Sequence, residues 1–143
     1  MTDQGESRYS AQQFRDLVKD IPFAMFTTVT AGGALRSRPM VASENAFDGN
    51  LWFFTRTSSA VAQEVAGSRM VNITYVSAPE DRFVSVSGAA EVVRDIERAG
   101  RMWSPAYNQW FAGGTSDPEL SLIKIEVARV EFWDRKAGRM REL

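Results

Sequence analysis

The chain has 143 residues, of which 44% are hydrophobic, and a formal net charge of −1. This composition suits one domain with its own core and argues against a general polyanion binder. The chain contains no cysteine and no histidine, which excludes disulfides, thiolate chemistry, catalytic triads and the usual transition-metal site, so tyrosine, carboxylates, lysine or a bound cofactor must carry any chemistry.

Residues 1–9 are polar, and we expect a flexible tail that lacks the apolar core of a signal peptide. No apolar run approaches the ~18 residues of a membrane-spanning helix, so we expect a cytoplasmic protein. Ser10 and Gln13 form a capping box before a short helix. The apolar face of that helix has i, i+3, i+4, i+7 spacing and consists of Phe14, Leu17, Val18 and Ile21. We expect a single domain over residues 10–136 and a polar C-terminal tail at 137–143.

Strands dominate the rest of the chain. The strand-like segments are FAMFTTVT, LRSRPMVASENAF, LWFFT, MVNITYV, RFVSVSGAAEVV and LSLIKIEVARVEFWD, the last as one long strand or two short ones. Asp48-Gly49 is a strong hairpin signal, which would make the second and third strands neighbours. Pro39 marks an edge or a bulge, and Gly88 marks a bulge or a sharp bend. Because the links are short, we predict a mainly β fold, a small antiparallel β-barrel with short helices plugging its ends.

Further short helices are expected between the strands. One follows LWFFT and ends at Gly67, one runs from Asp95 through Met102, and one begins at Ser104-Pro105. An aromatic series accompanies the last two, namely Trp103, Tyr107, Trp110 and Phe111. Such a stripe is typical of a core, and the alternatives are a dimer interface or a stacking wall for a planar ring.

The strand segment RSRPM carries two arginines on one face. Arg36 and Arg38 are two residues apart, and side chains at that spacing project from the same side of a strand. Two adjacent guanidiniums repel each other, and an anion or carboxylates between them would offset that repulsion. The alternatives are an anion site and a solvated strand face near Glu44 and Asp48.

The segment FFTRTSSAVAQEV reads as a strand end, a polar turn and a helix start. The turn holds Thr55, Arg56, Thr57, Ser58 and Ser59. Hydroxyls, a guanidinium and free N–H groups at a helix N-terminus suit phosphate, whereas one hydroxyl suffices for an ordinary cap. If the hairpin prediction holds, Arg38 and this turn face one cleft. The segment RFVSVSG, where serines alternate with valines, indicates a narrow polar face open to a ligand or a partner strand.

Taken together, these segments resemble the flavin-binding split-barrel proteins, the pyridoxamine 5'-phosphate oxidase-like superfamily, and within it the bacterial general stress protein group. The matching pieces are SRPM (37–40), DGNLWFFT (48–55), FVSVSGAAEV (83–92), MW (102–103), WFAGGTSDPEL (110–120) and VEFWD (130–134). The resemblance implies a six-stranded antiparallel split barrel of the FMN-binding type and a homodimer with flavin sites at its interface.

The same resemblance implies which residues contact the flavin. Arg38, Pro39 and Met40 would lie along it, and Phe54 and Thr55 would contact it. Ser58 and Ser59 would lie in the phosphate-binding turn, with Arg56 available to add charge. Trp110 would reach the cofactor region from the partner subunit. The expected cofactor is FMN, with FAD and a deazaflavin as alternatives.

Two departures from the family pattern qualify these expectations. Members commonly carry a phosphate-binding lysine two residues after the turn serine, where this chain has Val61. The affinity for flavin would then be reduced, or Arg56 or Arg36 would substitute, and Val61→Lys would tighten FMN. The arginine-rich C-terminal motif of true pyridoxamine phosphate oxidases is also missing, so we do not expect that activity. The functions left open are a flavin-dependent oxidoreductase or flavin carrier, a deazaflavin-dependent reductase, and a cofactor-free dimeric binding module.

Overall fold

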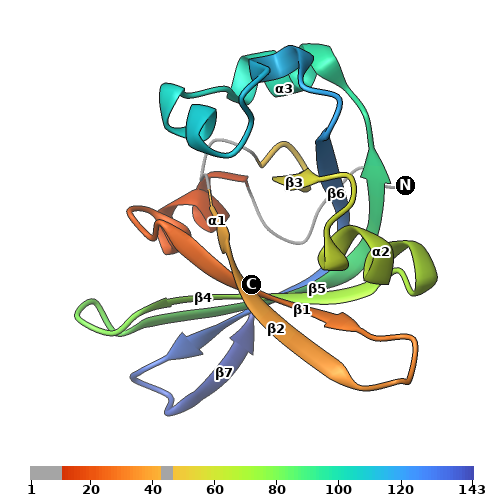
Figure 1. Cartoon of the computed structure of the whole chain (residues 1–143). Coiled ribbons are helices and arrows are strands. Elements are labelled where there is room, and N and C mark those ends of the chain that lie inside the picture. Colours follow the sequence, from red (N-terminus) through yellow and green to blue (C-terminus); the bar gives the residue numbers. More distant parts are fainter. Residues whose placement is uncertain (1–10, 43–46) are drawn as a thin grey trace, which may run out of the picture.

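The computed structural model describes residues 11–42 and 47–143. Within them, a seven-stranded antiparallel sheet has the order β2-β1-β4-β5-β6-β3, with β7 added to β6 (Figure 1). The predicted mainly β fold is therefore confirmed. The predicted tail at residues 1–9, the Ser10 cap and Glu44 lie outside the described residues.

The strands are β1 (Phe23–Val29), β2 (Leu35–Val41), β3 (Asn50–Arg56), β4 (Met70–Ser77), β5 (Arg82–Val93), β6 (Leu120–Asp134) and β7 (Arg139–Glu142). The helices are α1 (Ala11–Val18), α2 (Ala60–Gly67) and α3 (Ile96–Met102), followed by the 3₁₀ turns η2 (Pro105–Gln109) and η3 (Gly114–Ser116). The last predicted strand is thus one long strand, β6. No helix within residues 11–42 and 47–143 is long and apolar enough to cross a bilayer.

The predicted hairpin between β2 and β3 is wrong. β2 pairs with β1, and β3 pairs along its whole length with β6, so the two strands end opposite edges of the hydrogen-bonded order. The edges approach each other without forming a ladder, which leaves the barrel split. Asp48 instead organises the start of β3, because its carboxylate accepts from the Asn50 N–H and the Trp52 indole. Gly49, at φ +105°, supplies the backbone conformation that this entry requires.

The C-terminal residues also differ from the predicted tail. Arg139–Glu142 form β7 and pair with the end of β6. The Asp134 carboxylate accepts from the Ala137 N–H and from the Arg141 guanidinium, and Gly138 takes φ +66° in the turn. These tertiary contacts order a polar segment whose composition alone favours a tail.

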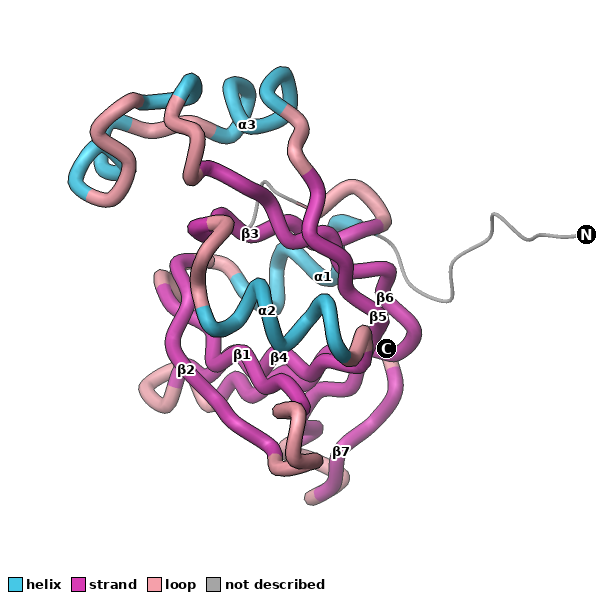
Figure 2. The backbone as a smooth tube through the Cα atoms, turned by 45° about the vertical axis from the view of Figure 1, so that its right-hand side comes forward, coloured by secondary structure: helices cyan, strands magenta, loops and turns pink. Residues whose placement is uncertain are grey.

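Two hydrophobic clusters lie on either side of β3. Leu51 and Phe53 point into the main core, which α1 and α2 cover. Trp52 and Phe54 point the other way, into a second cluster with α3 and η2. Figure 2 shows α1 and α2 within the outline of the strands, and α3 beyond β3. β3 is therefore buried on both faces, which explains its continuous apolar sequence.

Pro39 and Gly88 hold the positions that their residue types predict. Pro39 lies in β2, an edge strand of the ladder, where a missing N–H is tolerated. Gly88 lies at a register shift between β5 and β6. A Cβ at Gly88 would stand 2.4 Å from the carbonyl oxygen of Glu126. The bulge thus brings two backbones closer than any side chain allows.

Candidate functional site

Arg36 and Arg38 both turn toward α2, and a carboxylate lies between them. The Glu64 Oε1 is 2.5 Å from Arg38 Nη2, and its Oε2 is 3.0 Å from Arg36 Nη1. The Thr28 hydroxyl accepts from Arg38 at 2.7 Å and donates to Glu64 at 2.7 Å. The anion that the arginine spacing calls for is therefore supplied by the chain itself, and Asp48 pairs elsewhere, with Arg98 at 3.0 Å.

This contact joins three elements at one end of the barrel. β1 contributes Thr28, β2 contributes both arginines and α2 contributes Glu64. Only 12% of the Glu64 side chain is exposed. The hydrogen bond from Thr28 is the largest influence on the pKa of Glu64; burial opposes it, and Arg38 and Arg36 add to it, so the pKa lies below its ordinary value. The ionised cluster fixes α2 against the sheet.

The polar turn after β3 is in part a helix cap. Ser59 is the N-cap of α2, and its hydroxyl accepts from the Ala62 N–H at 3.1 Å. Thr55, which is buried, lies 2.8 Å from Ser59, oxygen to oxygen. Thr57 forms a similar contact with Ser121 at 2.7 Å. Three of the four turn hydroxyls are thus committed to structure, as a capping role requires.

The remaining groups of the turn converge on a second internal carboxylate. The Glu119 Oε1 accepts from the Ser58 hydroxyl at 2.5 Å and from the Ser58 N–H at 3.2 Å. The Arg56 guanidinium stands 3.9 Å from the same oxygen. The hydrogen bonds from Ser58 dominate, and the pKa of Glu119 is lowered. A hydroxyl, an N–H and a cation directed at one oxygen form an anion-binding set.

Val61 is a core residue in this structure. Its side chain is 6% exposed and belongs to the main hydrophobic cluster. A lysine at this position would have to thread its amine out of the core before it could meet a phosphate. The expectation that Val61→Lys tightens FMN therefore has no support in the placement of this side chain.

The aromatic series is mainly core, as its spacing favours. The Phe54 ring lies 4.4 Å from the Tyr107 ring and 5.7 Å from the Trp103 ring, centre to centre. Phe111 is buried with them, whereas Trp110 is 43% exposed. Arg56 donates to the Trp110 carbonyl at 2.8 Å, so the backbone of Trp110 lies beside the turn. Arg56, Ser58 and Trp110 are thereby brought together.

The other predicted contact residues do not join that group as free ligands. Arg38 is held by Glu64 at the α2 end of the barrel, Pro39 is exposed on the β2 edge, and Met40 packs partly against the main core. Phe54 is half-buried in the second cluster. Their roles toward a flavin remain predictions.

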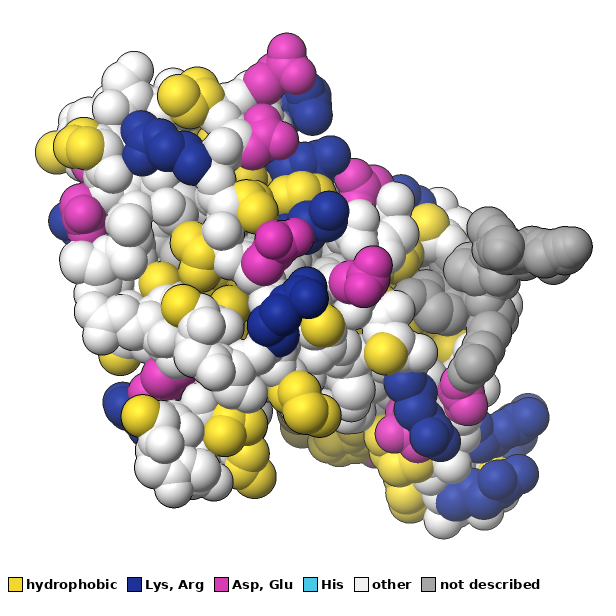
Figure 3. All heavy atoms as spheres, turned by 90° about the vertical axis from the view of Figure 1, so that its right-hand side faces the viewer, with side chains coloured by type: hydrophobic (Ala, Val, Ile, Leu, Met, Phe, Trp, Pro, Cys, Tyr) yellow, Lys and Arg dark blue, Asp and Glu magenta, His cyan; other side chains and the backbone are white. Residues whose placement is uncertain are grey.

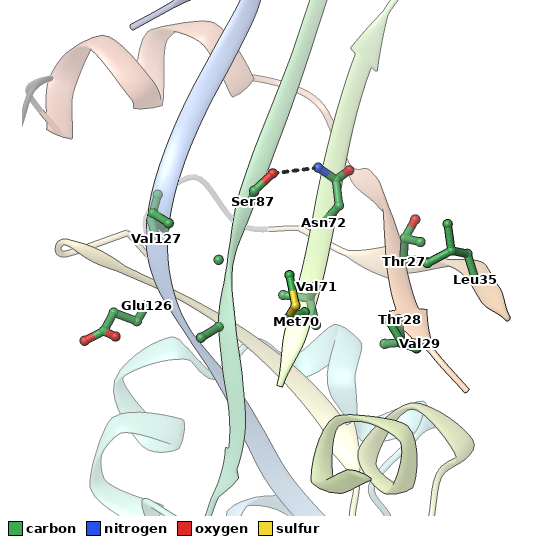
Figure 4. Close-up of a pocket in the computed structure, with 13 residues that line it drawn as sticks. Thr27, Thr28, Val29, Leu35, Met70, Val71, Asn72, Ser87, Glu126 and Val127 are labelled. Carbon is green, nitrogen blue, oxygen red and sulfur yellow. Dashed lines mark hydrogen bonds between the residues drawn. The ribbon is translucent and has the colours of Figure 1, made fainter. Parts of the chain in front are cut away.

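The outward face of β1, β4 and β5 forms an apolar groove of about 710 Å³. Figure 4 shows Thr27, Asn72 and Ser87 along it, with Asn72 donating to Ser87. Asn72 also donates to Ser85 at 3.0 Å. Of the two serines of RFVSVSG, Ser87 lines this outer groove, and both Ser85 and Ser87 accept a hydrogen bond from Asn72.

A model of the family described as pyridoxamine 5'-phosphate oxidase like matches residues 9–143. The chain belongs to this family. Among solved structures, the general stress FMN/FAD binding protein of Xanthomonas citri is 27% identical, with a TM-score of 0.72 over 86% of this chain and 87% of its own. A protein related to general stress protein 26 from Clostridium acetobutylicum is 15% identical, with a TM-score of 0.77 over 93% of this chain and 92% of its own. The latter likeness shows the fold alone.

A curated relative has the same sequence identity to this chain as the Xanthomonas citri protein. Protein bli-3 of Neurospora crassa is 27% identical over a match that covers 77% of this chain and 57% of bli-3. The chain thus matches little more than half the length of that relative. Proteins of this family have a split-barrel fold. The antiparallel sheet formed by β1 to β6 of this chain agrees with that fold.

Sequence reasoning missed both internal carboxylates. For Glu64 a signal existed, because it lies three residues after Val61 and so shares the buried face of α2. For Glu119 the loop sequence carries no periodicity. Its place is set by the ladder of β3 with β6, which continues through the bond from the Thr57 N–H to the Glu119 carbonyl.

Proposed function

We propose that this protein is an FMN-binding member of the general stress group, acting as a flavin-dependent oxidoreductase or a flavin carrier. The observation that carries the proposal is the convergence of the Ser58 hydroxyl, the Ser58 N–H and Arg56 on one carboxylate oxygen. A carboxylate oxygen presents the same acceptor as a phosphate oxygen, so this donor set fits the phosphate end of FMN. A bound flavin would supply the redox step, and the protein would supply binding and orientation.

The residues nearest the turn fit the rest of such a ligand in chemical type. Trp110 is 43% exposed and its carbonyl accepts from Arg56, and planar rings stack readily on an exposed indole. Ser59 and Thr55 keep the turn in shape through their mutual contact. FAD and a deazaflavin are alternatives within the same proposal.

A second candidate function is a cofactor-free binding module. Its support is that Glu64 and Glu119 already satisfy the two arginines of β2 and the Ser58 donors. Val61 adds to this support, because it supplies an apolar side chain where relatives have a cation.

Purified protein separates the two candidates. We expect a yellow preparation with flavin absorbance, or a colourless one whose melting temperature rises with added FMN, since a ligand that binds the native state must stabilise it. FAD and a deazaflavin are titrated in parallel. A colourless protein whose melting temperature is unaffected by all three would contradict flavin binding and favour the binding module.

We also propose that the protein forms a homodimer through the outer groove. The outward side chains of β1 and β4 are uncharged over their whole length: Phe23, Met25, Thr27, Val29, Met70, Asn72, Thr74 and Val76. Eight large hydrophobic side chains are exposed among the described residues. Five of them lie on or beside this face, namely Phe23, Met25, Leu35, Met70 and Val76. Glu126 of β6 also lines the groove and is the one charged residue among those that line it. A largely apolar face of this extent is typical of a contact between copies. Elsewhere, charges of both signs are interspersed, as one face in Figure 3 shows.

A further inference from the structure

Glu119 differs from Glu64 in how firmly its carboxylate is held. Glu64 is 12% exposed and contacts two arginines and a threonine. Glu119 is 33% exposed, and the cation that it pairs with among the described residues, Arg56, stands 3.9 Å away with a half-exposed side chain. The Glu119 carboxylate can therefore leave its place more readily than that of Glu64.

The backbone of Glu119 is fixed independently of its side chain. Its N–H donates to the Asp117 carboxylate at 2.9 Å, and its carbonyl accepts from the Thr57 N–H at 2.8 Å. Arg94 holds the same loop by donating to the Pro118 and Leu120 carbonyls. The side chain can rotate away from Ser58 while the loop keeps its shape, because none of these contacts uses the Glu119 carboxylate.

We propose that Glu119 is an internal competitor for the phosphate of a bound flavin. Its carboxylate occupies the Ser58 donors, so a phosphate must displace it before it can bind there. The displaced carboxylate stays near the phosphate, because its backbone is fixed, and it repels that phosphate. Glu119 thereby lowers the preference of the site for FMN over riboflavin, which carries no phosphate. This inference rests on the proposed flavin function.

The test is a pair of titrations, with FMN and with riboflavin, on the wild-type protein and on variants of Glu119. Glu119→Gln removes the charge and keeps an acceptor for Ser58, whereas Glu119→Ala removes both. Glu97→Gln is the matched control, because its side chain is 87% exposed on α3 and the substitution makes the same change in net charge. The readouts are the dissociation constants from quenching of flavin fluorescence and the shift in melting temperature with inorganic phosphate.

We expect Glu119→Gln to raise the affinity for FMN by about three- to tenfold, with riboflavin unchanged, and Glu119→Ala to do so at least as strongly. Glu97→Gln should behave as the wild type. If both flavins bind and the ratio of their dissociation constants is the same in every variant, the competitor role is wrong and the flavin function stands. If no variant binds either flavin, the flavin function is wrong. In that case the melting temperatures with inorganic phosphate test the competitor role. The role is supported if phosphate stabilises Glu119→Ala more than the wild type, and it is wrong otherwise.

Discussion

At the scale of single residues, two groups of hydrogen-bond donors that the sequence places close together each meet a carboxylate of the same chain. Glu64 neutralises Arg36 and Arg38, and Glu119 caps the Ser58 donors. An arginine pair alone does not tell whether its anion is a ligand or a side chain, because both satisfy the same guanidinium geometry. For Arg38 the structure gives the second answer. For Ser58 and Arg56 the internal anion, Glu119, is more exposed, and a ligand could compete with it for the same donors.

Glu64→Gln is expected to lower the melting temperature by a few degrees at pH 7, because Arg38 and Arg36 lose their counter-charge. The pKa of Glu64 is lowered in the folded protein from 4.5. The stability that its ionised form contributes is therefore fully present above the unfolded-state pKa and is lost as the pH falls through the folded-state pKa. The melting temperatures of the wild type and the variant should differ at pH 7, and the difference should shrink as the pH falls below 4.5 through the lowered folded-state pKa.

Glu97→Gln serves as the control for this pH series, since its carboxylate is exposed and pairs only along its own helix. A gap between wild type and Glu64→Gln that stays constant through the whole acid range, until the protein unfolds, would show that the charge of Glu64 is not what stabilises the cluster.

At the scale of elements, the bulge at Gly88 sets how β5 and β6 cross. The register of the two strands shifts between Ser87 and Gly88, and the strands pair on both sides of the shift. A bulge of this kind bends the sheet, which a small barrel needs in order to curl around its core. Ser87, directly before the bulge, then faces the outer groove.

Gly88→Ala should destabilise the protein by about 1–3 kcal/mol or more, because its Cβ would meet backbone at 2.4 Å rather than a flexible side chain. Gly100→Ala is the matched control: it lies inside α3 with nothing within 4 Å of the new Cβ, so it should be neutral or stabilise by up to ~1 kcal/mol. The free energies of unfolding are measured in urea. Equal effects of the two substitutions would contradict the close approach at the bulge.

At the scale of the whole molecule, the uncharged outward side chains of β1 and β4 predict self-association. Met70 is 73% exposed on this face and contributes nothing to the core of a single chain. Met70→Glu should therefore leave folding intact and place a charge in the contact between copies, which converts a dimer to a monomer. Sedimentation or light scattering at several concentrations reports the mass.

Ile96→Glu is the control for this experiment, because Ile96 is 55% exposed on α3, away from the groove. We expect it to remain dimeric. A monomeric wild type, or a Met70→Glu variant that stays dimeric, would show that this face is not the interface.

The sequence by itself determined the local features of this protein. Alternation located the strands, Asp95 and Ser104 capped the helices they precede, and Pro39 and Gly88 marked an edge and a bulge. These succeed because the causes are confined to a few neighbouring residues, namely a missing N–H, a missing Cβ or a hydroxyl near a free donor. The family resemblance also rests on such local segments.

Only the tertiary structure decided which strand lies beside which and what each charge meets. Asp48-Gly49 reads as a hairpin, yet β3 pairs with β6, because burying both of its faces requires partners far along the chain. The polar C-terminal residues form β7 because they pair with β6, and Arg141 donates to the Asp134 carboxylate across that pair. Glu64 and Glu119 reach their donors from positions 26 and 61 residues away in the chain. Contacts over such separations depend on the packing of the whole chain, so the local sequence does not identify which donors each carboxylate meets.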